Sequence, residues 1–332
     1  MFNNSSILIT GGTGSFGHAF ISMTLKKYRP KKLIIFSRDE IKQWQLAKLY
    51  KNNSNIRFFI GDVRDKDRLY RALGNVDYVI HAAALKIVPT AEYNPIEYVK
   101  TNIIGATNLI DACLDQGVKK VVALSTDKAC SPINLYGATK LASDKLFVAA
   151  NNYSGNKRTK FSIVRYGNVM GSRGSFIPFF YSLRDKNEIP ITDLRMTRFM
   201  VTLEQGVDLV WFAFKDMSGG EIYVKKTPSI KIVDVAKIIA PKARHKIIGI
   251  RAGEKIHEQM ISAEDSPTTY EYLKYFKILP QIDFFENRKL PKNAKKVKEG
   301  FVYDSSSNKI WISEQNLKLW IKKNIKMLKE HI

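Results

Sequence analysis

The chain has 332 residues, of which 45% are hydrophobic, and it carries a formal net charge of +23 at pH 7. No stretch approaches the ~18 uninterrupted apolar residues of a membrane helix, and the N-terminus lacks the pattern of a secretory signal, so we expect a cytoplasmic protein with no membrane partner. The lysines are spread along the whole chain without a nucleic-acid-binding motif, which favours an anionic small substrate over nucleic acid.

The first predicted elements are a short apolar strand, Ser6–Thr10, and an amphipathic helix from about Ser15 to Tyr28. Glycines between and just inside them recur at a spacing of three, which lets the backbone close on a pyrophosphate at the helix N-terminus. The sequence therefore predicts a dinucleotide site, with contacts from Gly11, Thr13, Gly14, Ser15, Phe16 and Gly17.

A second strand, Lys32–Phe36, ends in Ser37 and Arg38, and Lys42 follows one turn later. A hydroxyl and a guanidinium at this position favour the 2′-phosphate of NADP, whereas a carboxylate favours the ribose hydroxyls of NAD. We predict NADP because Ser37 and Arg38 come first, and the acidic pair that follows, Asp39 and Glu40, leaves NAD as the alternative.

Two further strands are predicted at Arg57–Gly61 and Val76–Ile80. The first runs into residues expected to contact the cofactor adenine, Asp62 and Val63. The second runs into Ala82 and Lys86, which we expect to contact the cofactor, with Lys86 also able to reach the substrate. A long helix is predicted from Tyr93 to Gln116, and the alternation of strands and helices up to about residue 165 predicts a Rossmann-type, doubly wound parallel sheet.

The stretch Val121–Lys140 carries the densest set of reactive side chains. An apolar strand, with Leu124 and Ser125 as expected cofactor contacts, leads into Thr126, Asp127 and Lys128. A helix predicted at Leu135–Ala150 then places Tyr136 and Lys140 on one face. Each of these features is common on protein surfaces. Their combination at the carboxyl end of a parallel strand, downstream of a nucleotide motif, predicts a catalytic centre.

The alternation of strands and helices ends after the predicted strand Phe161–Arg165. We therefore predict an NADP-binding domain over residues 1–165, with return elements near 202–240. The remainder, 166–332, is predicted to be mainly a smaller substrate-binding lobe and a C-terminal tail. A glycine-rich loop covers 165–175, and further elements are expected at 188–192, 202–214, 221–224 and 229–239. Val169 is a candidate cofactor contact, and the candidate substrate contacts are Lys86, Asn168, Ile177, Thr192, Arg251 and Glu254.

Two features of the C-terminal part are interpreted as structural rather than as functional sites. The basic tail from Asn287 to Ile332 is expected to pack through Trp311, Leu317 and Trp320. His257-Glu258 resembles the start of a zinc-protease motif, but position 261 is isoleucine, and the two cysteines show no ligand spacing, so no metal site is predicted.

Together, Thr10-Gly-x-x-Gly14-x-x-Gly17, the strand end at Ser125 and Thr126, and Tyr136-x-x-x-Lys140 resemble the extended short-chain dehydrogenase/reductase superfamily. The likeness continues through the 165–175 loop, Met196–Met200 and Arg251–Glu254. Within the superfamily, Thr126-Asp127-Lys128 resembles the UDP-N-acetylglucosamine 4,6-dehydratases that invert C5.

This resemblance implies an NADP-dependent lyase that supplies a keto-sugar for pseudaminic acid, used in bacterial flagellin and surface glycosylation. Tyr136 would take the O4 proton with its pKa lowered by Lys140, Lys128 would act as base at C5, and Asp127 would be the acid for the C6 hydroxyl. A charged Lys128 that stabilises an enolate is the alternative role. The resemblance also implies a homo-oligomer, a dimer through the helices 93–116 and 135–150 or a higher assembly such as a hexamer.

Three competing functions stay open at this stage. A nucleotide-sugar C4 epimerase shares the fold and the Tyr-Lys pair, but it does not need Asp127 and Lys128. A C5-retaining 4,6-dehydratase would carry Asp-Glu in their place. A non-catalytic NADP-binding regulator would usually lack Tyr136 or Lys140, and both are present.

Overall fold

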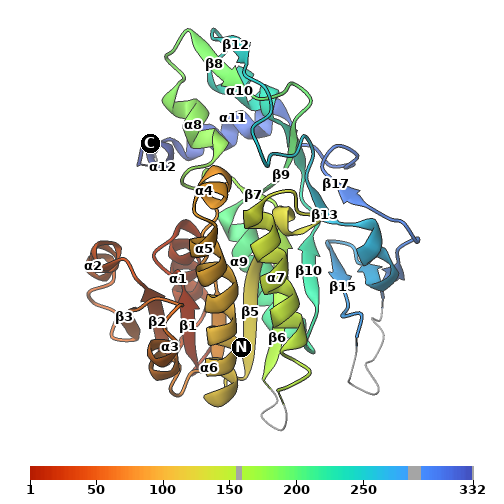
Figure 1. Cartoon of the computed structure of the whole chain (residues 1–332). Helices are drawn as coiled ribbons and strands as arrows, with labels where there is room; N and C mark the ends of the chain where they lie inside the picture. Colours follow the sequence, from red (N-terminus) through yellow and green to blue (C-terminus); the bar gives the residue numbers. More distant parts are fainter. Residues whose placement is uncertain (155–158, 283–292, 331–332) are drawn as a thin grey trace.

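The computed structural model describes residues 1–154, 159–282 and 293–330 (Figure 1). Within them, one 10-stranded sheet has the order β16-β14-β15-β10-β6-β5-β4-β1-β2-β3. Its strands are β1 Ser6–Thr10, β2 Lys32–Ser37, β3 Ile56–Ile60, β4 Tyr78–His81, β5 Lys120–Thr126, β6 Lys160–Tyr166, β10 Ile222–Lys225, β14 Thr269–Glu271, β15 Tyr275–Ile278 and β16 Lys295–Lys296.

The part of this sheet from β3 to β10 is parallel throughout, and β15, β14 and β16 extend it antiparallel. Parallel strands are buried on both faces, which explains why β1 reads as an uninterrupted apolar run and is buried along its whole length. The strand order reverses between β1 and β4. Ligands of such sheets bind at the carboxyl ends of the strands beside this point.

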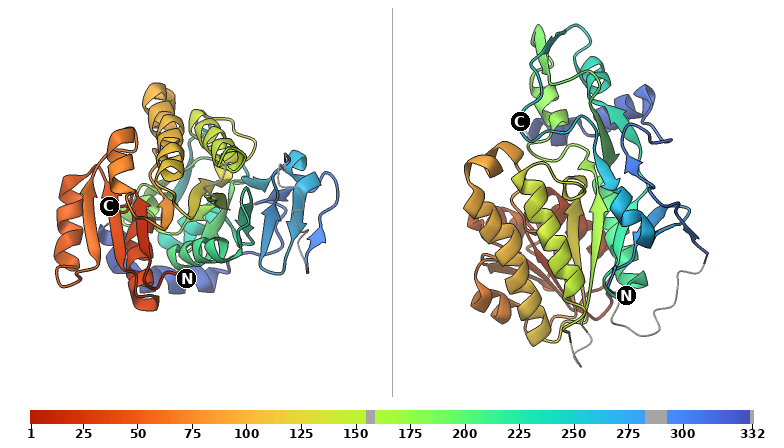
Figure 2. Two further views of the ribbon diagram at one scale, coloured as in Figure 1. Left: turned by 90° about the horizontal axis from the view of Figure 1, so that it is seen from below. Right: turned by 45° about the vertical axis from the view of Figure 1, so that its right-hand side comes forward.

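Helices cover both faces of the sheet (Figure 2). On one face, α1 (Ser15–Lys27) packs with α9 (Leu203–Asp216), and their apolar sides share one core cluster. The other face is covered by α3 (Lys66–Ala72), α6 (Gly105–Asp115) and α7 (Leu135–Ala149), which share a second cluster. The predicted doubly wound, Rossmann-type fold is confirmed.

A smaller lobe lies above the carboxyl ends of the parallel strands (Figure 1). Its strands form the three-stranded sheet β11-β9-β7 and the pair β12-β8, and its helices enclose a separate apolar cluster. These elements are β7 Asn168–Val169, α8 Phe176–Ser182, β8 Glu188–Ile191, β9 Thr197–Val201, β11 Ser229–Lys231, α10 Ile232–Ile239, β12 Arg244–Ile247, α11 Glu314–Lys323 and α12 Ile325–Glu330.

The remaining described elements are short. They are α2 Glu40–Leu49, α4 Val88–Tyr93, α5 Pro95–Tyr98, the π-helix η1 Val99–Ile104, the 3₁₀-helices η2 Asp127–Ala129 and η4 Ala263–Thr268, β13 Gln259–Ile261 and β17 Tyr303–Asp304. None of the helices in the described ranges is long and apolar enough to span a membrane.

Most predicted elements are confirmed to within about two residues, and two differ. The helix predicted at Tyr93–Gln116 is a series of segments, α4, α5, η1 and α6. Pro95 lacks an amide hydrogen and disfavours helical geometry at Asn94, which adopts φ −122° and ψ 60°. The helix predicted at Ser229–Ile239 begins only at Ile232, because residues 229–231 pair with β9 as strand β11.

The C-terminal tail packs through two of the three residues predicted to anchor it. Leu317 is fully buried and Trp320 packs on the cluster of the smaller lobe, as predicted. Trp311 is 41% exposed and its indole N–H donates to the carbonyl of Asn308, so its prediction as a packing anchor is wrong. Positions 287–292 and 331–332 of the predicted basic tail lie outside the described residues.

Candidate active site

The turn between β1 and α1 has the close backbone packing that a dinucleotide cradle requires. A Cβ atom on Gly17 would lie 2.1 Å from the carbonyl oxygen of Gly12, and Gly11 has φ +65° with Ala83 directly beside it. Gly14 is the N-cap of α1, and no side chain caps this helix end. The amide hydrogens of the first turn are therefore directed at a place suited to a pyrophosphate.

The end of β2 brings together the residues predicted to select the cofactor. The hydroxyl of Ser37 lies 2.8 Å from that of Thr13, which ties the strand end to the glycine turn. Arg38 is exposed, and its Nη1 lies 3.6 Å from Asp62. Nζ of Lys42 lies 2.6 Å from the carboxylate of Asp39, the N-cap residue of α2. Two cations therefore flank this strand end, each with a neighbouring carboxylate.

The other predicted cofactor contacts lie around the same carboxyl edge. Val63 and Ser125 are buried, and Ser15, Phe16, Ala82, Leu124 and Val169 are partly exposed. Ala82 donates its amide hydrogen to the carbonyl of Thr10, which holds the segment after β4 beside the glycine turn. Nζ of Lys86 donates to the carbonyl of Arg173 at 3.3 Å, so Lys86 connects this segment to the glycine-rich loop.

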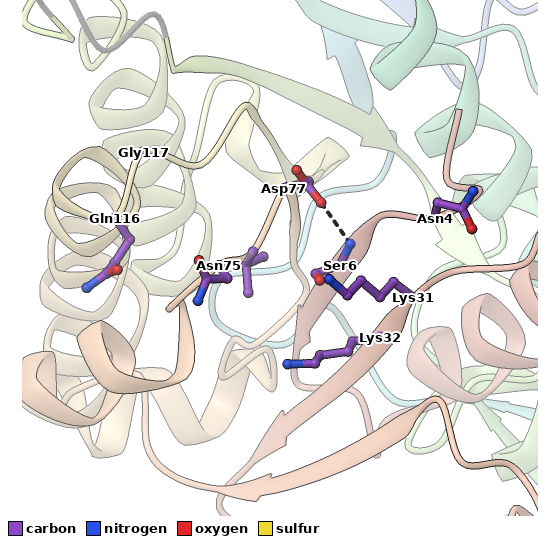
Figure 3. Close-up of a pocket in the computed structure, with 9 residues that line it drawn as sticks. Asn4, Ser6, Lys31, Lys32, Asn75, Asp77, Gln116 and Gly117 are labelled. Atoms are coloured by element: carbon purple, nitrogen blue, oxygen red, sulfur yellow. Dashed lines mark hydrogen bonds between the residues drawn. The ribbon is translucent and has the colours of Figure 1, made fainter.

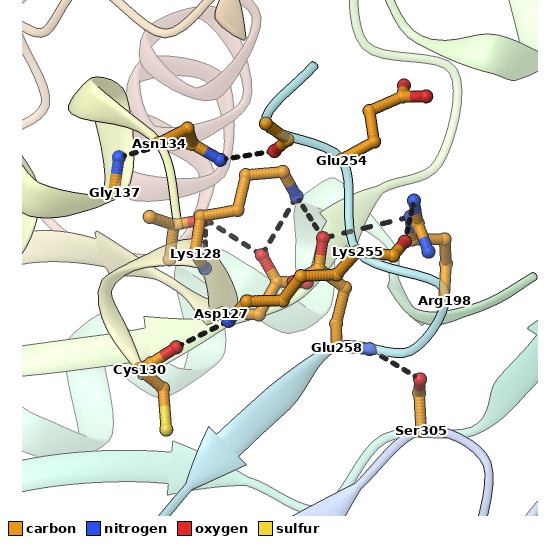
Figure 4. A network of polar contacts seen from close by, with 12 residues as sticks. Asp127, Lys128, Cys130, Asn134, Gly137, Arg198, Glu254, Lys255, Glu258 and Ser305 are labelled. Carbon is orange, nitrogen blue, oxygen red and sulfur yellow. Dashed lines mark hydrogen bonds and ion pairs between the residues drawn. The ribbon is translucent and has the colours of Figure 1, made fainter. Parts of the chain in front are cut away.

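The catalytic stretch forms a tight cluster at the end of β5 (Figure 4). Asp127 begins η2 and is buried. Its Oδ1 accepts a hydrogen bond from the hydroxyl of Thr126 at 2.9 Å and one from Nζ of Lys128 at 3.1 Å. The structure brings the three predicted residues together as one hydrogen-bonded group.

Glu258, which the sequence did not identify as a site residue, completes this cluster. Its Oε1 lies 3.1 Å from Nζ of Lys128 and 3.8 Å from Nε of Arg198 on β9. The side chains of Asp127 and Glu258 are only 1% and 2% exposed, whereas that of Lys128 is 20% exposed. Lys128 is thus clamped between two buried carboxylates and is the member of the cluster that reaches open space.

Each carboxylate keeps a second oxygen without a partner. Oδ2 of Asp127 and Oε2 of Glu258 are buried and accept no hydrogen bond from any residue that the structure describes. Buried carboxylate oxygens are rarely left unpaired, because the loss of water is costly. Unpaired buried carboxylate oxygens beside other charged groups are a feature of functional sites, so this cluster is the candidate reaction centre.

The charged groups in this cluster shift one another's pKa values. Burial and the nearby carboxylate of Glu258 raise the pKa of Asp127, although Lys128 opposes the shift. Burial lowers the pKa of Lys128, but Asp127 and Glu258 outweigh it and the net pKa is raised well above its usual range. Despite burial, Lys128 and Arg198 lower the pKa of Glu258. The two carboxylates therefore favour the ammonium form of Lys128.

Tyr136 and Lys140 lie buried on α7. Burial raises the pKa of Tyr136 to about 12, and the groups that lower it are Lys128 and the hydroxyl of Thr126. Nζ of Lys140 donates to the carbonyl of Leu124 at 2.9 Å, and burial lowers the pKa of this amine. Lys128 thus supplies a charge that favours the phenolate of Tyr136, and the predicted effect of Lys140 on the phenol stays a prediction.

The predicted substrate contacts occupy the smaller lobe and the loop before β13. Oδ1 of Asn168 and Oε2 of Glu254 are buried, and neither has a hydrogen-bond partner among the described residues. Arg251 forms an ion pair with the other oxygen of Glu254. Thr192 is partly exposed at the end of β8, whereas Ile177 is fully buried in the cluster of the smaller lobe. These residues stay predictions, and Ile177 could act only through its backbone or by packing.

A polar pocket lies at the opposite edge of the sheet (Figure 3). It is lined mainly by residues before β1, β2 and β4, including Asn4, Ser6, Lys31, Asn75 and Asp77. Asp77 accepts from the amide of Ser6 and pairs with Lys119, so its carboxylate is already satisfied. Ligands bind at the carboxyl ends of such sheets, and this pocket therefore does not compete with the cluster at β5. Within the described ranges, no group of three or more His, Cys, Asp and Glu side chains could hold a metal ion.

With this geometry established, comparison with known proteins identifies the family. A family model described as "Polysaccharide biosynthesis protein" matches residues 7–280. The chain belongs to this family.

The chain is also similar to three known proteins. A UDP-N-acetylglucosamine 4,6-dehydratase (inverting) from Campylobacter jejuni is 58% identical over 325 residues, 96% of this chain and 97% of that protein. A UDP-glucose 4-epimerase from Rickettsia prowazekii is 43% identical over 286 residues, 84% of each chain. The X-ray structure of Pen from Bacillus thuringiensis matches with a TM-score of 0.89 and 39% identity over 98% of this chain and 99% of that one. The resemblance to the inverting dehydratases is confirmed.

Proposed function

We propose that the chain is a lyase that converts UDP-N-acetylglucosamine into UDP-2-acetamido-2,6-dideoxy-β-L-arabino-hexos-4-ulose. The reaction oxidises C4, eliminates water across C5 and C6, reduces C6 and inverts C5, with no net oxidation. The observation that carries the proposal is the buried Asp127–Lys128 pair beside Tyr136, in a chain 58% identical to an inverting dehydratase.

NADP is the proposed cofactor. The glycine turn before α1 would hold the pyrophosphate, and Ser37, Arg38 and Lys42 would face the 2′-phosphate. When bound, the nicotinamide accepts a hydride from C4 of the sugar and returns it to C6. The residues of this chain then have to move the protons.

Tyr136 would take the proton from O4 of the sugar. Lys128 and the hydroxyl of Thr126 are the groups that favour its phenolate, and they offset part of the cost of burial. Asp127, whose pKa is raised, is suited to donate a proton to the departing C6 hydroxyl. The ammonium of Lys128 favours the role of stabilising the enolate that forms once the C5 proton has left.

The product would supply a pathway to pseudaminic acid for flagellin or surface glycosylation, and the cytoplasm is the proposed location. We also propose a homo-oligomer that pairs through the helical stretch 93–116, which includes α6, and through α7. Light scattering at working concentration should report a dimer or a higher assembly, and a monomer would contradict this part of the proposal.

The decisive experiment is incubation with UDP-N-acetylglucosamine followed by mass spectrometry and NMR. The product should have lost one water, and in deuterium oxide it should carry solvent deuterium at C5 with inverted configuration. A dehydrated product with retained C5 would instead identify a retaining 4,6-dehydratase.

The second candidate is a nucleotide-sugar C4 epimerase, favoured by the 43% identity to the Rickettsia protein. An epimerase returns the hydride to C4 and releases no water. A product of unchanged mass, with the configuration at C4 inverted, would select this function over the dehydratase.

A further inference from the structure

We propose that Glu258 is a positioning residue for the dehydration: it fixes Nζ of Lys128 opposite Asp127, so that one N–H of the lysine faces the substrate and serves as a proton donor at C5. This inference rests on the function proposed above and deepens it. It assigns a role to a residue whose neighbourhood in the sequence suggested only an incomplete metal motif.

The hydrogen-bonding capacity of Lys128 supports this assignment. An ammonium group has three N–H donors and no acceptor. One points to Oδ1 of Asp127 and one to Oε1 of Glu258, each at 3.1 Å. The third has no acceptor among the residues that the structure describes, and the lysine is the exposed member of the three. Two carboxylates therefore orient the group so that one N–H is left for the substrate.

Glu258 is itself rigidly placed. Its backbone N–H donates to the hydroxyl of Ser305 at 2.9 Å, and the N–H of Ser305 donates back to the carbonyl of Glu258 at 2.8 Å. Nearby, Lys255 donates to the carbonyl of Cys130 at 2.7 Å, which ties the segment before Glu258 to the loop after Lys128 (Figure 4). The carboxylate is thus held at a fixed distance from Nζ, which is what a positioning residue requires.

The charges around Lys128 show why Glu258 is needed. The carboxyl groups of Asp127 and Glu258 contact its Nζ. Tyr136 on α7 and the cations Arg198 on β9 and Lys86 after β4 are close enough to interact with its charge. With Glu258 removed, one carboxylate would remain against these cations, in a site that has lost most of its water. The ammonium form would lose its main support on the side opposite Asp127.

The proton balance of the reaction leaves a place for this donor. Two protons leave the sugar, one from O4 to Tyr136 and one from C5 to solvent water. Two are taken up, one by the departing C6 hydroxyl from Asp127 and one by C5 from Nζ of Lys128, which becomes a neutral amine. The proton held by Tyr136 and one from solvent then restore Asp127 and the ammonium of Lys128. Glu258 favours this return because its charge stabilises the protonated form.

The test compares Glu258→Gln with Glu221→Gln in the full chain loaded with NADP. Glu221 is also 2% exposed and accepts hydrogen bonds from Ser162 and Gly219, so its replacement controls for the general cost of losing a buried carboxylate. For Glu258→Gln, kcat should fall roughly 10- to 100-fold, as for the loss of one charge-assisted hydrogen bond, with KM within about twofold. The alkaline limb of the kcat profile should move to lower pH, because Lys128 would lose its proton more readily. Glu258→Asp, which keeps the charge, should recover part of the rate.

A second readout does not depend on turnover. Lys128 should resist acylation by acetic anhydride up to high pH in the wild type and in Glu221→Gln, and become reactive at lower pH in Glu258→Gln, as followed by mass spectrometry. An unchanged pH profile together with unchanged labelling of Lys128 would overturn the inference. If the wild type releases no water from any nucleotide sugar, the proposed function fails, whereas the labelling still decides the role of Glu258.

Discussion

Two regions at the same edge of the sheet contribute to the site in opposite ways. The turn between β1 and α1 works through its backbone, with glycines packed so closely that a Cβ on Gly17 would overlap the carbonyl of Gly12. The cluster at the end of β5 works through buried charge, with Lys128 between Asp127 and Glu258. One region is contiguous in the sequence, and the other joins segments that are far apart.

This difference predicts how each of the two regions responds to substitution. The backbone turn depends on the absence of side chains, so any added atom harms it. The cluster depends on a balance of charge in a site with little water, so that removal of one member changes the protonation of the others. Variants in the two regions should therefore fail in different ways, and the following predictions test that contrast from the largest effect to the smallest.

Lys128→Met should have the largest effect on turnover. It removes the cation of the cluster, and turnover should fall by roughly 10²–10⁴-fold, the range typical of a group that moves protons. The variant also leaves two buried carboxylates without their shared partner, which costs about 3–5 kcal/mol of the free energy of unfolding. Affinity for NADP, measured by calorimetry, should stay near the wild-type value. A stable variant with substantial dehydratase activity would contradict the charged cluster.

Asp127→Asn should lower turnover by a similar order, roughly 10²–10⁴-fold, but without the loss of stability. The pKa of Asp127 is raised in the folded chain, so its protonated form contributes stability that is present below the unfolded pKa and is lost as pH rises through the folded value. At neutral pH the neutral amide should therefore match or exceed the wild type in thermal unfolding. The difference should shrink as the pH is lowered, and a variant that is less stable at every pH would argue against the raised pKa.

Gly17→Ala tests the other region. The added Cβ would lie 2.1 Å from the carbonyl oxygen of Gly12, so the turn must shift, at a cost of about 1–3 kcal/mol, and dinucleotide affinity should fall. Gly74→Ala is the matched control, because its Cβ would lie 3.7 Å from the carbonyl oxygen of Arg71, an ordinary contact distance. Calorimetric titration with NADP should separate the two variants, and equal affinities would show that the turn does not bind the cofactor.

Arg38→Ala should have the smallest effect and the most selective one. Loss of a charge-assisted hydrogen bond to a 2′-phosphate should weaken NADP by roughly 10- to 100-fold and leave NAD within about twofold. Lys48→Ala on α2, where the amine lies over the ring of Trp44, is the control for a general loss of positive charge. If both cofactors weaken equally, Arg38 does not select NADP.

The accuracy of the sequence-based predictions follows the same division. The glycine turn, the parallel strands and the Thr126–Lys128 group were predictable, because each is encoded in neighbouring residues whose periodicity or spacing has a local cause. The long helix predicted at Tyr93–Gln116 failed at a local signal, Pro95, whose effect on Asn94 could have been anticipated. The strand at Ser229–Lys231 could not, since its pairing with β9 depends on residues far away in the chain.

The sequence by itself determined the fold class, the place of the nucleotide turn and the presence of an acid, an amine and a phenol near one strand end. Only the tertiary structure decided the surroundings of Lys128. It brought Glu258 and Arg198 to the cluster, buried both carboxylates and put Lys128 close enough to Tyr136 to lower the pKa of its phenol. The reason is physical: a strand or a turn follows from the conformational preferences of adjacent residues, whereas a pKa follows from the loss of water and from the charges that distant segments bring within a few ångströms.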